Sequence, residues 1–288
     1  MNNFVIFTDS ACDIYPEVLE KWGVGCVSLA FRFDHIDRDY KNEDMPIQEF
    51  YRNMRDGHIA KTNAVNIDAF SKAFEKVLSE GKDLLYLGFS SGLSATFRQG
   101  KLAAEDLAEK YPDRKIIAID TLCASAGQGL IVKLALDKMN AGASIEETAA
   151  YVNELIPKLA HWFTVEELVY LKRGGRVSPA VALVGGMLQI KPIMHVDNDG
   201  HLVKIGIKRG RRASLDELCS RMQELAFDPA EQTVFISHGD CEEDAKYLAD
   251  RIRDAMGVQN FVIDYVGPVI GAHSGPGTMA LFFLGKER

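Results

Sequence analysis

Cysteine is scarce in this 288-residue sequence, and its positions match neither a metal site nor a disulfide framework. The five cysteines are odd in number and no two of them form a Cys-x-x-Cys pair. Structural zinc sites and disulfide-rich secreted domains depend on such spacings. We therefore expect buried free thiols in a reducing cytoplasm. The cysteines are Cys12, Cys26, Cys123, Cys219 and Cys241.

Long hydrophobic runs and excess basic charge are also missing. No apolar run reaches the roughly 18 residues of a transmembrane helix, and MNNFVIFTDS lacks the basic and apolar regions of a signal peptide. The net charge is −8, from 41 acidic and 33 basic residues, which argues against nucleic acid as a partner. No Walker A or G-x-G-x-x-G motif stands in the right context, so we expect no nucleotide site and no cofactor.

Candidate metal ligands do not gather along the chain. Asp9 and Asp13 in TDSACD are too few for a Mg²⁺ or Ca²⁺ cage, and Asp13 is instead expected to cap a helix. His238 has no second ligand at metal spacing. The sequence therefore predicts no metal site.

Strand and helix patterns alternate through the first half of the chain. This alternation predicts an α/β fold with a mostly parallel sheet covered by helices, followed by an α+β part with antiparallel pairing. We place the boundary near residue 160, with domains 1–160 and 161–288. Among the expected elements are a helix over 13–23, one strand over 24–33, and a strand running through 260–273 into the glycine-rich segment GPVIGAHSGPG (267–277).

Polar clusters follow several expected strands. They are TDSACD (8–13), SSGLSAT (90–96) and DTLCASAGQG (120–129). Ligands of parallel α/β sheets bind beyond the carboxyl ends of the strands. Together with the glycine-rich segment, whose backbone N–H groups suit an anion, these clusters are expected to share one cleft.

GFSSG (88–92) matches the G-x-S-x-G nucleophile elbow between a strand and a helix. Ser90 would be the nucleophile, with Asp264 and His273 as its acid and base. No HGGG-type oxyanion loop lies upstream. The alternative is that these serines cap a helix and line a polar cleft. LKRGGRVSP (171–179) has two interpretations as well, an anion site or a tight turn with solvated charges.

The order of the motifs over the whole chain resembles the DegV family. They are FTDSACDI, GFSSGLSATF, IDTLCASAGQG, EELVYLKRGGRVS, KPIMHVDNDG and GPVIGAHSGPG. The resemblance implies a bacterial lipid-binding protein, with a fatty acid between an N-terminal three-layer α/β domain and a C-terminal α+β domain. It also implies the fatty-acid-binding subunit of a two-component fatty acid kinase, which has no activity without an ATP-dependent partner.

The resemblance further implies the residues that bind the carboxylate. Ser94 stands in SSGLSAT, Thr62 in KTNAVN and His273 in GAHSGPG. Two departures from the family pattern, the loop 63–66 without proline and Ala95 in place of glycine, can alter head-group contacts or chain preference. Neighbouring residues of the same motifs are included as fatty-acid-binding candidates, namely Ser91, Gly92, Gly271 and Ala272.

Two further segments remain open. The apolar stretch AVALVGGMLQIKPIM (180–194) is either a tunnel wall or ordinary core. The basic segment KIGIKRGRRAS is either a solvated face or a docking surface for the kinase, through Arg209, Arg211 and Arg212. The sequence is consistent with three functions: a fatty acid carrier for a kinase, a carrier or sensor without a kinase, and a serine hydrolase.

Overall fold

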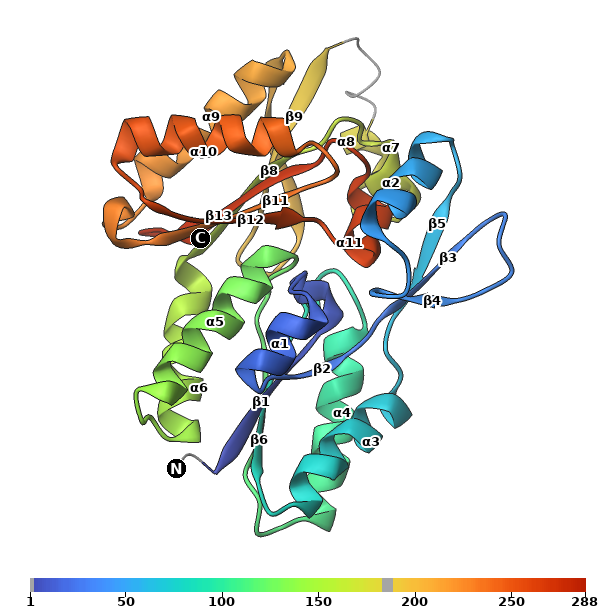
Figure 1. The fold of residues 1–288 in the computed structure, drawn as a ribbon, viewed down its shortest axis with the longest axis vertical. Coiled ribbons are helices and arrows are strands. Elements are labelled where there is room, and N and C mark those ends of the chain that lie inside the picture. The colour runs from blue at the N-terminus through green and yellow to red at the C-terminus, as the bar shows by residue number, and fades with distance from the viewer. Residues whose placement is uncertain (1–2, 183–188) are drawn as a thin grey trace.

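The computed structural model describes residues 3–182 and 189–288. Its strands form a four-stranded, a six-stranded and a three-stranded sheet, here called sheets A, C and B (Figure 1). The α/β class predicted from the alternating pattern is confirmed. Among the described residues, no helix is both long enough and apolar enough to cross a membrane.

Sheet A is entirely parallel, in the order β2-β1-β6-β7. The central strands β1 and β6 are largely buried on both faces, and their alternate residues pack on opposite sides. Ile6 and Leu85 belong to the core beneath α5 and α6, whereas Phe7 and Leu84 pack toward α3 and α4. The elements are β1 (Phe4–Asp9), β2 (Gly25–Val27), β6 (Asp83–Gly88), β7 (Ile116–Asp120), α3 (Ile67–Ser79), α4 (Thr96–Lys110), α5 (Ala126–Asn140) and α6 (Ile145–Leu155).

Sheet C has the order β10-β9-β8-β13-β11-β12, and only β11 and β12 pair in parallel. The expected hairpin at DNDG joins β9 to β10, and Gly200 there adopts a φ of 78°. Its elements are β8 (Leu159–Thr164), β9 (Ile190–Val196), β10 (Leu202–Arg209), β11 (Thr233–His238), β12 (Asn260–Tyr265) and β13 (Met279–Leu284), with α9 (Arg211–Leu225) and α10 (Glu242–Met256) packed on it.

Sheet B is a small antiparallel sheet beside the other two. Two sequence expectations fail in this N-terminal part of the chain, one on a strand and one on a helix cap. The single strand expected over 24–33 is broken into β2 and β3 (Ala30–Phe33), which belong to different sheets. Asp13 does not cap α1 (Pro16–Trp22), because it is left-handed with φ 52° and instead ends the short 3-10 helix Ser10–Cys12. The other elements here are β4 (Tyr40–Lys41), β5 (Ala60–Asn63) and α2 (Ile47–Arg55).

The glycine-rich segment is largely helical, which corrects the strand expected over 260–273. Strand β12 ends at Tyr265, and α11 (Pro268–Ser274) follows. Pro268 is at the first helical turn, where its fixed φ and missing N–H cost nothing. Position 271 in this helix requires glycine, because a Cβ there would be 2.7 Å from the Tyr51 hydroxyl. Helix α11 thus packs closely against α2 (Figure 1).

The cysteines are all free, as expected. Cys12, Cys123 and Cys219 are buried, and Cys241 is partly buried. Cys26 is exposed, so the expectation of buried thiols was wrong for this residue. It lies on β2, one of the two edge strands of sheet A.

Candidate ligand cavity

A cavity of about 270 Å³ lies where the carboxyl ends of sheet A meet sheet C and α11. This volume is close to the lower end for small-molecule pockets, roughly 300 Å³. Most of its lining is apolar. That part comprises Leu29, Ala64, Phe89, Leu93, Ala95, Ala124, Phe163, Leu171, Val196, Leu202, Val266, Val269, Ile270, Ala280 and Phe282.

Two of the predicted site residues form a pair in this cavity. Thr62, on β5, and His273, on α11, both line it. The Thr62 Oγ1 and the His273 Nε2 are 2.8 Å apart. When His273 is protonated at Nε2 it donates to Thr62, and the Thr62 hydroxyl is then free to donate to an anion in the cavity.

His273 is held in its neutral form. Burial, reinforced by the positive charge of Arg176, lowers the pKa of His273 to about 4. Its Nδ1 is buried without a partner among the described residues. This nitrogen faces Gly174, where a Cβ would approach it to 2.0 Å. The ring therefore depends on a glycine for its position.

Arg176 brings positive charge to the same end of the cavity. It lines the cavity, and its Nε and Nη2 donate to the Leu93 carbonyl at 3.0 and 2.8 Å. Of the two interpretations of 171–179, the anion site gains support from this placement. The sequence motif 171–179 did not single out Arg176 as a site residue. Lys172 and Arg173 are exposed and do not line the cavity.

Ser94 lines the cavity just before α4. Its Oγ is 2.9 Å from the Thr96 hydroxyl and accepts the Thr96 N–H at 3.2 Å. Ser94 also follows Leu93, whose carbonyl binds Arg176. The structure thus places Ser94 beside a fixed guanidinium, within the same cavity as Thr62 and His273.

The other four predicted fatty-acid-binding residues do not line the cavity. The Ser91 N–H donates to Asp120, and a Cβ on Gly92 would meet the Asp199 carbonyl at 2.8 Å. Gly271 and Ala272 lie on α11 and face away from the cavity, toward the aromatic cluster of α2 and β3. These four, Ser91, Gly92, Gly271 and Ala272, support the loops and the helix around the site.

The three residues of the proposed hydrolase triad do not meet. Ser90 is fully buried, and its Oγ donates to the Gly200 carbonyl at 2.8 Å. His273 is paired with Thr62 instead. Asp264, on β12, lines a different hollow beside Tyr15, and burial raises the pKa of its carboxyl. The G-x-S-x-G serine here ties sheet A to the β9–β10 turn.

The strand-end clusters do converge, as expected, but unequally. Ser94 and Ser125 line the cavity, whereas TDSACD lies behind it. The Ser125 hydroxyl donates to Asp13 at 2.5 Å and is 3.0 Å from the Ser237 hydroxyl. Burial raises the pKa of Asp13 to about 7. Asp13 therefore anchors the loop before α5.

Segment 180–194 lies partly outside the described residues, at 183–188. Of its described residues, none lines the cavity; Val181 packs on the main core and Ile193 beneath α9. The tunnel-wall interpretation therefore stays a prediction.

The basic segment is divided between two elements. Arg209 is exposed at the end of β10, and α9 begins at Arg211. Arg211 is partly buried and pairs with Asp244 at 2.8 Å. Arg212 is exposed, with its guanidinium 3.9 Å from the Tyr247 ring centre. The three arginines therefore differ in how free they are to meet a partner.

Comparison with known proteins agrees with this architecture. Residues 3–286 match the family model described as "Uncharacterised protein, DegV family". A DegV domain-containing protein of Clostridium perfringens is 42% identical over all of this chain and 99% of its own. The crystal structure of a DegV lipid-binding protein from Thermotoga maritima is similar over 100% of both chains, with a TM-score of 0.87 and 28% identity. A fatty-acid-binding DegV family protein from Thermus thermophilus gives a TM-score of 0.85 at 26% identity, over 97% of this chain and 98% of its own.

Proposed function

The chain belongs to the DegV family, and from this premise we propose that it binds a long-chain fatty acid in the cavity. The carboxylate lies at Thr62, Ser94 and His273, with Arg176 supplying positive charge. The acyl chain lies along the apolar lining. The proposed domains, 1–160 and 161–288, enclose the ligand between them.

One observation carries this proposal: an apolar cavity whose hydroxyls, neutral imidazole and guanidinium come from separate elements. Burying a carboxylate without partners costs several kcal/mol, and these groups provide partners. Each buried methylene gains about 0.8 kcal/mol, so roughly fifteen carbons gain at most on the order of 12 kcal/mol before binding entropy is subtracted. The chain supplies affinity and the polar end supplies orientation.

Extraction of lipid from protein purified from bacteria tests the proposal. We expect a long-chain fatty acid at close to one per chain, identified by mass spectrometry after denaturation. A protein that yields no fatty acid, and binds none when it is added to the delipidated form, contradicts the carrier function.

We further propose that the bound carboxylate is presented in the cytoplasm to an ATP-dependent kinase subunit, which forms the acyl phosphate. The proposal follows from the family resemblance and from the basic segment on an otherwise acidic chain. Phosphoryl transfer requires positioning and positive charge around the phosphate oxygens. The chain itself is then a lipid-binding subunit rather than a complete enzyme.

The structure sharpens the test of this docking role. Arg209→Glu with Arg212→Glu reverses two exposed charges, whereas Arg211 is left intact because its loss would leave Asp244 unpaired. We expect slower acyl-phosphate formation with the cognate kinase and unchanged fatty acid binding, since rim charges mainly set association rate.

A matched control reverses two exposed charges elsewhere, Lys76→Glu on α3 with Arg98→Glu on α4. Wild-type rates for the arginine pair across a salt series, or equal slowing by the control, contradict docking at this surface. If no kinase stimulates acyl-phosphate formation, the carrier or sensor function without a kinase is supported instead.

A further inference from the structure

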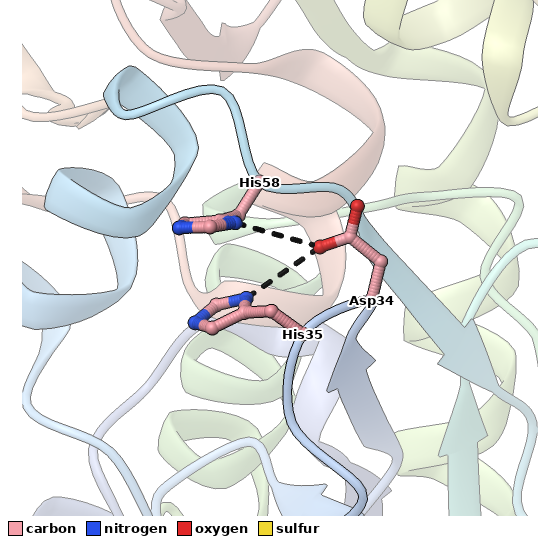
Figure 2. A group of neighbouring side chains, drawn as sticks. All are labelled: Asp34, His35 and His58. Atoms are coloured by element: carbon pink, nitrogen blue, oxygen red, sulfur yellow. Dashed lines mark ion pairs between the residues drawn. The ribbon is translucent and has the colours of Figure 1, made fainter.

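Two histidines and an aspartate converge on sheet B, away from the lipid cavity. Asp34 and His35 follow β3, and His58 lies between α2 and β5 (Figure 2). Both imidazoles turn their Nδ1 toward the same Asp34 oxygen, as Figure 2 shows. Sequence patterns did not reveal this group, because His58 is distant along the chain from the other two.

The distances are too long for hydrogen bonds but suit a shared cation. Asp34 Oδ1 is 3.5 Å from His35 Nδ1 and 3.7 Å from His58 Nδ1. A direct N–H···O bond would bring these atoms to about 2.9 Å. Ligands placed 2.0–2.1 Å from a tetrahedral zinc ion are separated by about 3.3–3.4 Å. Side-chain rotations that separate the two imidazole rings would bring all three atoms to such an ion.

The backbone holds the three residues in this arrangement. Strands β3 and β5 pair up to Phe33 and Ala60, and the Asp34 N–H donates to the Ile59 carbonyl at 2.9 Å. The His58 N–H donates to the Asn53 carbonyl at the end of α2. The two turns are therefore fastened together before any ligand arrives, which lowers the entropic cost of binding.

The two rings stack on each other in the structure and must separate to bind one ion, because imidazoles on a tetrahedral zinc ion have centroids roughly 5 Å apart. The imidazoles of His35 and His58 stack with centroids 3.5 Å apart and planes 24° apart. Stacked imidazoles that both point a nitrogen at one carboxylate present two borderline-soft donors and one hard donor on one side. Imidazole suits zinc, copper, iron and nickel, whereas magnesium and calcium prefer oxygen alone.

The surrounding charges permit a cation. Arg32 is next to the cluster, but it is paired with Asp37 at 3.0 Å and Asp39 at 2.8 Å. Lys61 lines the same shallow hollow as Asp34 and His35 and opposes binding.

From this geometry we propose that Asp34, His35 and His58 form a binding site for a divalent transition-metal ion of the zinc class. The ion is held by one carboxylate oxygen and two Nδ1 atoms, and its remaining positions face solvent. It fastens the turn after β3 to the segment before β5. Because β5 carries Thr62, the ion also stiffens the strand that holds part of the lipid site.

Titration of the full, untagged protein with Zn²⁺ tests the site. Cys26→Ser is used as the background throughout, so that the exposed Cys26 sulfur does not compete for zinc. We expect one Zn²⁺ per chain with a micromolar dissociation constant, and a rise in Tm when Zn²⁺ is added. His35→Ala, His58→Ala and Asp34→Asn should each weaken binding at least tenfold.

His201→Ala is the matched control, because His201 is also exposed beside an aspartate, 3.9 Å from Asp197. Among the residues that the structure describes, no further histidine, cysteine or carboxylate joins this pair in a group of three, so its removal should leave Zn²⁺ binding unchanged. When Co²⁺ is added to protein in which all three histidines are intact, the NMR signals of His35 and His58 should shift more than that of His201. Absence of Zn²⁺ binding at millimolar concentration, or retention of one Zn²⁺ in the His35 and His58 variants, overturns the proposal. Equal loss in the His201 variant, or a largest Co²⁺ shift at His201, also overturns it.

Discussion

Ser94 provides the sharpest test of the proposed head-group site. Its hydroxyl lines the cavity and also accepts the Thr96 N–H at the start of α4. We expect Ser94→Ala to weaken fatty acid binding, because the bound carboxylate then lacks one hydrogen-bond donor. Losing a hydrogen bond to a charged group costs roughly 1–3 kcal/mol, which is a 5- to 150-fold rise in the dissociation constant.

The same change should also lower the free energy of unfolding, since it removes the acceptor of the Thr96 N–H, a hydrogen bond of about 1 kcal/mol. Ser144→Ala separates the two effects. Ser144 caps α6 by accepting the Glu147 N–H at 3.2 Å, and it does not line the cavity. We expect Ser144→Ala to lower stability by a similar amount and to leave the dissociation constant unchanged.

The assay is a titration of delipidated protein with a fluorescent fatty acid, alongside denaturant unfolding of the same samples. Unchanged affinity in Ser94→Ala would refute the assignment. Equal weakening by Ser144→Ala would show that affinity follows stability rather than the head-group contact.

Three further outcomes are expected. The pKa of Asp13 is raised to about 7 in the folded protein, so the wild-type protein loses stability as the pH rises from about 4 through 7. Asn carries no titrating group. The free energy of unfolding of Asp13→Asn should therefore rise by roughly 2–4 kcal/mol relative to wild type over that pH range, as measured by unfolding at a series of pH values. Gly174→Ala should weaken fatty acid binding by displacing the His273 ring, whereas Gly206→Ala, with no atom within 4 Å of its Cβ, should bind as wild type in the same titration. Ser90 should not react with a fluorophosphonate probe, because its hydroxyl is buried and bonded to a carbonyl; stoichiometric labelling would revive the hydrolase.

Local patterns in the sequence were enough to predict most helices and strands. Continuous apolar runs such as DLLYLG become buried parallel strands because both faces are covered, and that property is visible in the residues themselves. The DNDG hairpin was predictable for the same reason, since the turn chemistry is local. The motif order indicated the family, and with it Thr62, Ser94 and His273.

Local patterns failed where neighbouring elements decide the conformation. The segment after β12 is apolar and glycine-rich, which suits a strand or a loop equally well. Packing against α2, with Gly271 close to Tyr51, makes it a helix. Asp13 does not begin α1, because its backbone is left-handed at the end of the preceding 3-10 helix and its side chain is bonded to Ser125, far along the chain.

The sequence by itself determined the order of elements, the apolar faces and the motif residues, because each depends on residues close together in the chain. Only the tertiary structure brought Thr62 to His273 and His58 to Asp34, and turned Arg176 toward the cavity. These contacts between distant residues depend on how the sheets and α11 pack together. Contacts between segments that are distant in sequence leave no periodic signal in either one, so the chemistry of both sites becomes visible only in the folded chain.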